Sequence, residues 1–99
     1  MQNIIQLATL ELNEGASMED WKKMSDKISS DLNYAKGFIS RDSAVGEDGK
    51  VYCIVKWESQ EDAKVMQEKL QSDEFKGAME AFAKIVNMAT MKSKTLKVV

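Results

Sequence analysis

The hydrophobic pattern of the chain is organised around residues 51–82. Apolar and polar side chains alternate over 51–58, which predicts a strand that ends in Trp57 and Glu58. At Ser59 the spacing becomes helical, and a second helical segment begins at Ser72, so each serine is expected to cap a helix. The apolar positions of the second segment are Phe75, Ala78, Met79, Phe82, Ala83 and Val86. A strand that leads into a helix lying across the sheet is half of a small α+β domain.

The first half of the chain has the same order of strand and helix. Residues 3–12 predict a strand that is apolar on both faces. Ser17 and Asp20 form a capping box for a helix that is expected to end before Gly37. The apolar stripe of this helix is Met18, Trp21, Met24, Ile28 and Leu32. A weaker strand over 38–45 follows, and an Asp-Gly turn predicts that it forms a hairpin with residues 51–58.

The order of the elements predicts the fold. The pattern returns to that of a strand over 87–99, which completes the order β-α-β-β-α-(α)-β. This order predicts an α+β, ferredoxin-like sandwich with a four-stranded antiparallel sheet and helices on one face. Because the first and third strands carry apolar side chains on both faces, the second face of the sheet also needs a cover. We expect that cover to be a second copy of the chain, which predicts a homodimer through the open sheet face.

Composition narrows the classes of partner. Ninety-nine residues are expected to form one domain over 1–99. The net charge is −2, and no block of like charge is present, which argues against a nucleic-acid partner. No apolar run approaches the ~18 residues of a membrane span, and no basic segment resembling a signal peptide precedes the first strand, so we expect no membrane partner. With a single cysteine, the expected location is the cytoplasm.

The chain contains no histidine and one cysteine, Cys53. This composition excludes histidine metal sites, zinc sites that use several cysteines, and histidine-based catalytic triads. We expect no metal site, and we expect no other cofactor. Cys53 lies among valines in its predicted strand and is expected to be an inert, buried thiol.

A family resemblance is carried by residues that end the third strand and flank the following helices. These are Trp57-Glu58-Ser59, Asp62-Ala63 and Leu70-Gln71-Ser72-Asp73-Glu74-Phe75. The run resembles the signature of the antibiotic-biosynthesis-monooxygenase-like domain, and the element order matches over nearly the whole chain. The resemblance implies a dimeric α+β barrel in which two ferredoxin-like sheets close face to face. Members of that family include cofactor-independent monooxygenases that act on quinols and polyketide anthrones, haem-degrading enzymes and proteins of unknown activity.

The chain departs from the family at positions where relatives carry histidine. Lys69 and Glu74 occupy the positions directly before Leu70 and Phe75 at which family members commonly have histidines. Met79 occupies the position of the iron-ligating histidine of the haem-degrading branch. We therefore do not expect haem degradation.

The candidate site residues follow from the chemistry of a cofactor-independent oxygenase. Such an enzyme needs polar groups that hold a deprotonated substrate and a dry apolar pocket. Tyr52 and Arg41 are the candidate catalytic residues: a phenol orients a phenolic substrate, and a guanidinium anchors a carboxylate or an oxyanion. The candidates for the pocket wall between sheet and helices are Trp57, Tyr34, Met79 and Phe82.

Each candidate also has a structural interpretation. Trp57 and Met79 lie on apolar stripes, where core packing is the commoner role. Arg41 is also consistent with an exposed strand residue or an ion pair at an interface, and Tyr52 with the side of the sheet that faces a partner. Two functions therefore stay open: a monooxygenase for a quinol or an aromatic polyketide-like molecule, and a non-enzymatic dimeric module that binds a small ligand or has a structural role. A cavity lined by Tyr52, Arg41 and side-chain amides would favour the first.

Overall fold

The structure is a computed structural model that describes residues 3–99. In chain order the elements are β1 (Ile4–Leu12), α1 (Met18–Leu32), β2 (Phe38–Val45), β3 (Val51–Trp57), α2 (Gln60–Leu70), the short 3-10 turn η1 (Asp73–Phe75), α3 (Lys76–Ile85) and β4 (Val86–Lys97). The predicted order of strands and helices is confirmed. Within the described part of the chain, no helix combines the length and the apolar character needed to cross a membrane.

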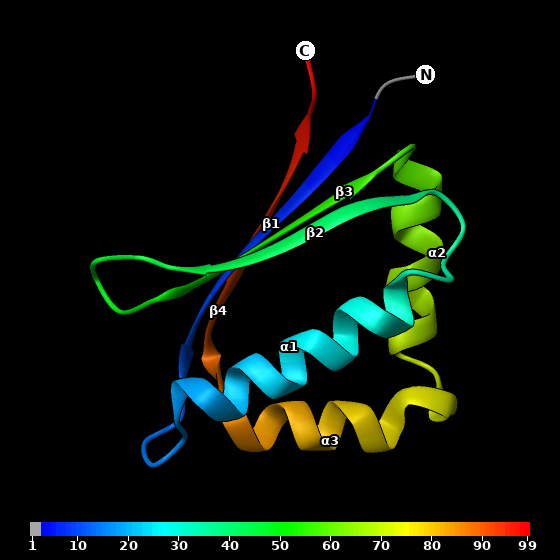
Figure 1. Ribbon diagram of the computed structural model, residues 1–99. Helices are drawn as coiled ribbons and strands as arrows, with labels where there is room; N and C mark the ends of the chain where they lie inside the picture. The colour runs from blue at the N-terminus through cyan, green and yellow to red at the C-terminus, as the bar shows by residue number, and fades with distance from the viewer. Residues whose placement is uncertain (1–2) are drawn as a thin grey trace.

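The four strands form one antiparallel sheet in the order β2-β3-β1-β4. The helices lie together against one face of this sheet, and the other face is uncovered in the structure (Figure 1). The first strand, β1, is central: Leu7 is paired with Ile54 of β3 on one side and with Lys94 of β4 on the other. This is the predicted ferredoxin-like arrangement.

The helix starts follow the predicted capping chemistry in two cases out of three. The Ser17 hydroxyl accepts from the Asp20 amide at 3.1 Å while the Asp20 carboxylate accepts from the Ser17 amide, which is a complete capping box. Ser59 likewise accepts from the Asp62 amide at 3.2 Å. The prediction for Ser72 is wrong: its hydroxyl donates backward to the Lys69 carbonyl at 2.6 Å, and the helical segment opens with the turn η1.

The interior consists of two hydrophobic clusters, each built around one tryptophan. Trp21 packs in the first with Leu10, Val51, Cys53 and Val86, and its ring lies edge-on to Phe82 with the centroids 6.0 Å apart. The second cluster contains Trp57, Ile4, Leu32 and Ala63, with Phe38 edge-on to the Trp57 ring at 5.8 Å. Both tryptophan side chains are therefore part of the packed interior, as their stripes predicted.

Several boundaries differ from the sequence pattern: β1 begins at Ile4, and β4 spans Val86–Lys97 instead of 87–99. Val86 was expected to continue the stripe of the last helix, but it is the first residue of β4 and is paired with Leu12 in the sheet. Val86 is fully buried in the first cluster, which explains why the position is apolar although it belongs to the strand and not to the helix. The third strand ends at Trp57, one residue earlier than predicted, because the Glu58 amide donates to the Gly37 carbonyl outside the sheet at 2.8 Å.

The uncovered face of the sheet carries apolar residues at its centre. Strand alternation places Ile5, Leu7, Tyr52 and Ile54 opposite the buried residues of β1 and β3. One row across this face runs from Asp42 through Ile54 and Leu7 to Lys94. The row therefore has an acidic end on β2, an apolar centre and a basic end on β4.

Candidate functional site

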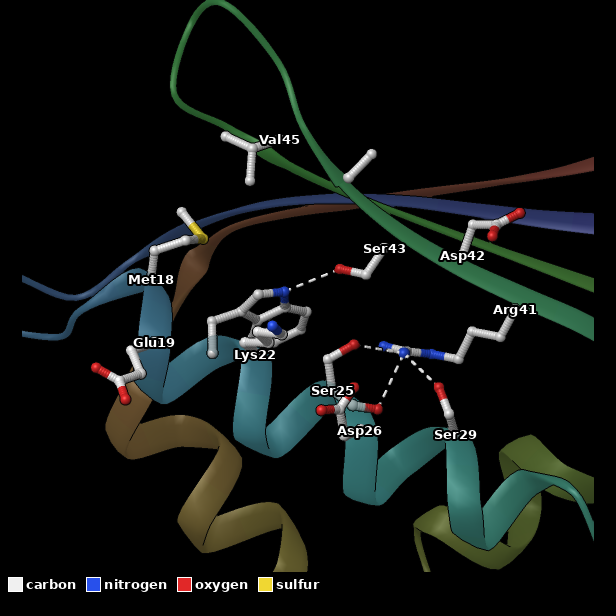
Figure 2. Close-up of a pocket in the computed structure, with 12 residues that line it drawn as sticks. Met18, Glu19, Lys22, Ser25, Asp26, Ser29, Arg41, Asp42, Ser43 and Val45 are labelled. Carbon is white, nitrogen blue, oxygen red and sulfur yellow. Dashed lines mark hydrogen bonds between the residues drawn. The ribbon is translucent and has the colours of Figure 1, made fainter.

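A groove with a volume of about 510 Å³ lies between α1 and β2. Its residues come from one face of the helix and from the facing strand: Met18, Glu19, Trp21, Lys22, Ser25, Asp26, Ser29, Arg41, Asp42, Ser43, Ala44 and Val45. Figure 2 shows Met18 and Val45 at one end of this groove and Arg41 with Ser29 at the other. We call it the α1–β2 groove.

Arg41 spans the space between the strand and the helix (Figure 2). Its Nη1 donates to the Ser25 hydroxyl at 2.6 Å, to the Ser25 carbonyl at 3.1 Å and to the Ser29 hydroxyl at 3.0 Å. Ser25 and Ser29 are four residues apart on α1, so both hydroxyls lie on the side of the helix that faces the sheet. Arg41 is therefore half-buried and held by the helix, whereas the sequence had also allowed an exposed strand residue or an interface ion pair.

A bulge in β2 brings Arg41 to this side of the sheet. The pairing of β2 with β3 shifts register between Phe38 and Ser40, so one extra residue is inserted at Ile39. Phe38 packs on the second cluster, yet three residues later Arg41 also faces the helices. Without the bulge, strict alternation would have put Arg41 on the uncovered face.

The Trp21 side chain forms the apolar part of the groove wall. Its indole Nε1–H donates to the Ser43 hydroxyl of β2 at 2.9 Å, which fixes the orientation of the ring. The side chain is only 3% exposed, whereas Met18 at the rim of the groove is 42% exposed. The groove thus combines an ordered aromatic wall with an exposed, polarisable side chain at its mouth.

Cys53 lies beneath Arg41, with 3.8 Å between its Sγ and Arg41 Nη2. Burial raises the pKa of the Cys53 thiol above its usual value, and the nearby positive charge of Arg41 offsets only part of that rise. The thiol is therefore protonated near neutral pH and is not a ready nucleophile, in line with the sequence interpretation.

Tyr52 does not share a site with Arg41. It lies on the opposite face of the sheet, between the buried residues Val51 and Cys53, and its phenol donates to the Asp48 carboxylate at 3.1 Å. This hydrogen bond raises the pKa of the Tyr52 phenol. The backbone amide of Lys50, which donates to the Asp48 carboxylate, is the main reason that the pKa of Asp48 is lowered. The Tyr52 phenol is thus a hydrogen-bond donor near neutral pH.

The four pocket candidates from the sequence are dispersed. Trp57 is 1% exposed in the second cluster and donates its indole N–H to Gln6 Oε1 at 3.0 Å. Tyr34 is 91% exposed after the end of α1. Phe82 supports Trp21 from the side of α3, and Met79 lies half-buried on the same helix. Of all the predicted site residues, Arg41 alone lines the α1–β2 groove.

The serines of the groove were missed at the sequence level. Ser25 follows Trp21 by four residues and therefore occupies the apolar stripe of α1, where it is 6% exposed. A small polar residue in such a stripe signals that a polar partner faces it from the sheet. Ser29 continues this row, and Ser43 meets Trp21 from β2.

The groove has the groups to bind a small polar-ended molecule. The guanidinium of Arg41 and three serine hydroxyls supply polar contacts, and Met18, Trp21 and Val45 supply apolar contacts. Within residues 3–99, no group of three or more cysteine or carboxylate side chains is arranged to hold a metal ion.

Comparison of the sequence with family models and with curated proteins found no match. Comparison with solved structures did. The chain is similar in structure to SnoaB, a cofactor-independent oxygenase from Streptomyces nogalater, with a TM-score of 0.78 and 9% identity over 100% of this chain and 95% of that one. A proposed antibiotic biosynthesis monooxygenase from Caulobacter crescentus matches with a TM-score of 0.76 and 15% identity, over 99% and 91% of the two chains.

A third similar structure is protein SO0527 from Shewanella oneidensis, with a TM-score of 0.74 and 17% identity over 98% of this chain and 91% of that one. In all three cases the match covers nearly the whole of both chains, whereas the identities are too low to carry over any residue's role. The resemblance predicted from Trp57-Glu58-Ser59 and its neighbours is thus confirmed for the fold. The chain has the ferredoxin-like fold of the antibiotic-biosynthesis-monooxygenase-like domain.

Proposed function

We propose that the protein is a small monooxygenase-like protein that binds an aromatic, quinol-like or polyketide-like molecule in the α1–β2 groove. The observation that carries the proposal is the groove, whose volume of about 510 Å³ suits a small-molecule ligand. A cation at one end and an aromatic wall at the other match the oxygen atom and the ring of such a molecule. The likeness of the fold to SnoaB, described as a cofactor-independent oxygenase, supports the reaction class.

In a cofactor-independent reaction of this kind, the deprotonated substrate supplies the electrons. A CH2 group beside an aromatic ring reacts with O2 and becomes a carbonyl, and the second oxygen atom leaves as water. Arg41 is the group that we assign to the developing enolate or phenolate, because a preorganised cation stabilises negative charge most strongly where water is excluded. Asp26, on the helix side of the groove, is the carboxylate that we assign to the proton.

The alternative is a binding module without chemistry, and the position of Tyr52 favours it. The two residues proposed as a catalytic pair lie on opposite faces of the sheet, and the Tyr52 phenol is engaged by Asp48. A ligand in the α1–β2 groove would then meet Arg41, the serines and Trp21 without a tyrosine.

Oxygen consumption with a panel of quinols and anthrones distinguishes these functions. We expect turnover by the wild type, a loss of about a hundredfold in Arg41→Ala, and wild-type rates in the exposed control Tyr34→Phe. The Tyr52→Phe variant decides between the two faces: if its rate falls and that of Arg41→Ala does not, the reaction takes place on the uncovered face. Binding of panel members without oxygen consumption would support the binding module.

We also propose that the uncovered face of the sheet pairs with a second copy of the chain. A two-fold axis parallel to the strands would place β2 of one protomer over β4 of its partner. The acidic end of the Asp42 row would then meet the basic end at Lys94, and the apolar residues Ile54 and Leu7 would meet at the centre. Charge and hydrophobicity are both complementary in this arrangement.

Light scattering at micromolar concentration tests the pairing. We expect twice the protomer mass for the wild type and the protomer mass for Ile54→Glu, because the new carboxylate would be buried without a partner. Val65→Glu is the matched control, since Val65 is 54% exposed on α2. A wild-type protein that has the protomer mass would contradict the proposal.

A further inference from the structure

The Arg41 guanidinium is a half-buried cation whose described partners are all uncharged. Its hydrogen bonds go to the hydroxyl and the carbonyl of Ser25, to the hydroxyl of Ser29 and to the thiol of Cys53. The ion pair that the structure forms within residues 3–99 joins Lys23 and Glu19 on the surface of α1, away from Arg41. Within the described residues, the charge of Arg41 is thus held in the groove without an ion pair.

The donor geometry of Arg41 leaves room for a further acceptor. A guanidinium has five N–H groups in a planar fork. Three of the four hydrogen bonds of Arg41 belong to Nη1, which faces α1 (Figure 2), and Nε donates to none of the described residues. The edge formed by Nε and Nη2 matches the two oxygens of a carboxylate, the acceptor with which arginine makes its strongest paired hydrogen bonds.

The other end of the groove is suited to a ring. Met18, Trp21 and Val45 form its apolar part, and the hydrogen bond from Trp21 Nε1 to Ser43 holds the indole in place. The groove volume of about 510 Å³ accommodates a molecule of one or two rings.

The other charges of the groove lie in solvent. Glu19, Asp26 and Lys22 are exposed at its rim, and the Asp42 side chain lies on the uncovered face of the sheet. Exposed charges are strongly screened. Arg41 is half-buried, so its surroundings are less polar than water. Its charge therefore attracts an opposite charge more strongly than the exposed charges of the rim do.

We propose that the ligand of the α1–β2 groove is a planar carboxylic acid of one or two rings, bound with its carboxylate on Arg41 and its ring against Met18, Trp21 and Val45. This inference rests on the proposed function for the location of the ligand and narrows its chemical class. A neutral quinol would leave the charge of Arg41 without a counter-ion, whereas an acid supplies it.

The two indole N–H signals in a proton–nitrogen NMR spectrum provide the test. Trp21 donates within the groove, whereas Trp57 donates to Gln6 in the second cluster and serves as a control in the same spectrum. The ligands are 2-naphthoate, 2-naphthol with the same rings and no carboxylate, and acetate with no ring. We expect 2-naphthoate to shift the Trp21 signal, to leave the Trp57 signal in place, and to bind about tenfold or more tightly than the other two.

The variants separate the paired hydrogen bonds from charge alone. We expect Arg41→Gln to weaken 2-naphthoate binding by about tenfold or more and Arg41→Lys to weaken it less. Lys27→Gln, which removes an exposed cation of α1 outside the groove, should change it little. The ligand comparison in the wild type remains decisive if Arg41→Gln does not fold.

The outcomes distinguish this inference from the proposed function. If 2-naphthol binds as tightly as 2-naphthoate and shifts the Trp21 indole signal, the ligand need not be an acid, and the groove remains the ligand site. If no compound shifts the Trp21 indole signal, both the proposed class of ligand and its location in the groove are wrong. Unchanged 2-naphthoate affinity in folded Arg41→Gln would also overturn the role of Arg41.

Discussion

Replacement of Trp57 by alanine is expected to lower the free energy of unfolding by about 3–5 kcal/mol. The side chain is 1% exposed and joins the sheet to both α1 and α2 through Leu32 and Ala63. Its removal leaves a cavity, deletes the edge-on contact with Phe38, and leaves Gln6 Oε1 without its donor. Because a domain of this size is typically stable by only about 5–15 kcal/mol, a large part of the stability would be lost.

Urea unfolding followed by circular dichroism measures this loss without relying on tryptophan fluorescence. Tyr34→Ala is the matched control: it also removes an aromatic ring, but one that is 91% exposed, and it should change the free energy by less than about 0.5 kcal/mol. A loss of less than about 1 kcal/mol in Trp57→Ala would show that the second cluster is not packed as described.

Gly37→Ala is expected to cost about 2–5 kcal/mol, from two separate causes. Gly37 has a φ of +80°, which alanine adopts only with strain. An added Cβ would also lie 2.6 Å from Asp62 Cβ and would overlap the carboxylate that packs on this glycine. Asp62 cannot move away freely, because its carboxylate accepts from the Ser59 hydroxyl at the start of α2.

Two other glycines separate these causes. Gly49 has the same φ of +80° with nothing within 4 Å of an added Cβ, so Gly49→Ala measures the backbone strain alone. Gly77 lies inside α3, also with nothing within 4 Å, and Gly77→Ala should stabilise the protein by about 1 kcal/mol. Thermal and urea unfolding of the three variants give the comparison. Equal losses in Gly37→Ala and Gly49→Ala would mean that the contact with Asp62 contributes nothing.

The fold could be predicted because its signals are local. Alternation marks the strands, the serines at 17 and 59 mark two helix starts, and the Asp-Gly pair marks the hairpin. Ser72 shows the limit of such signals: the same residue type before acidic residues donates to the Lys69 carbonyl instead, and the turn η1 lies between it and α3.

The site could be predicted only in part, because it depends on one inserted residue. The sequence singled out Arg41, but no glycine marks the bulge at Ile39 that turns Arg41 toward α1. Tyr52 was paired with Arg41 on chemical grounds, and strand alternation on β3 places it on the other face. The serine partners of Arg41 became visible only when α1 and β2 were placed against each other.

The central position of β1 has a consequence for how the chain folds. Ile4 is paired with Lys97, so one complete edge of the first strand depends on the last strand of the sheet. During synthesis that edge must wait until β4 has emerged from the ribosome, because contacts between distant residues form late. Over that interval an exposed strand edge is available to other chains, and slow translation before β4 would extend the period in which aggregation competes with folding.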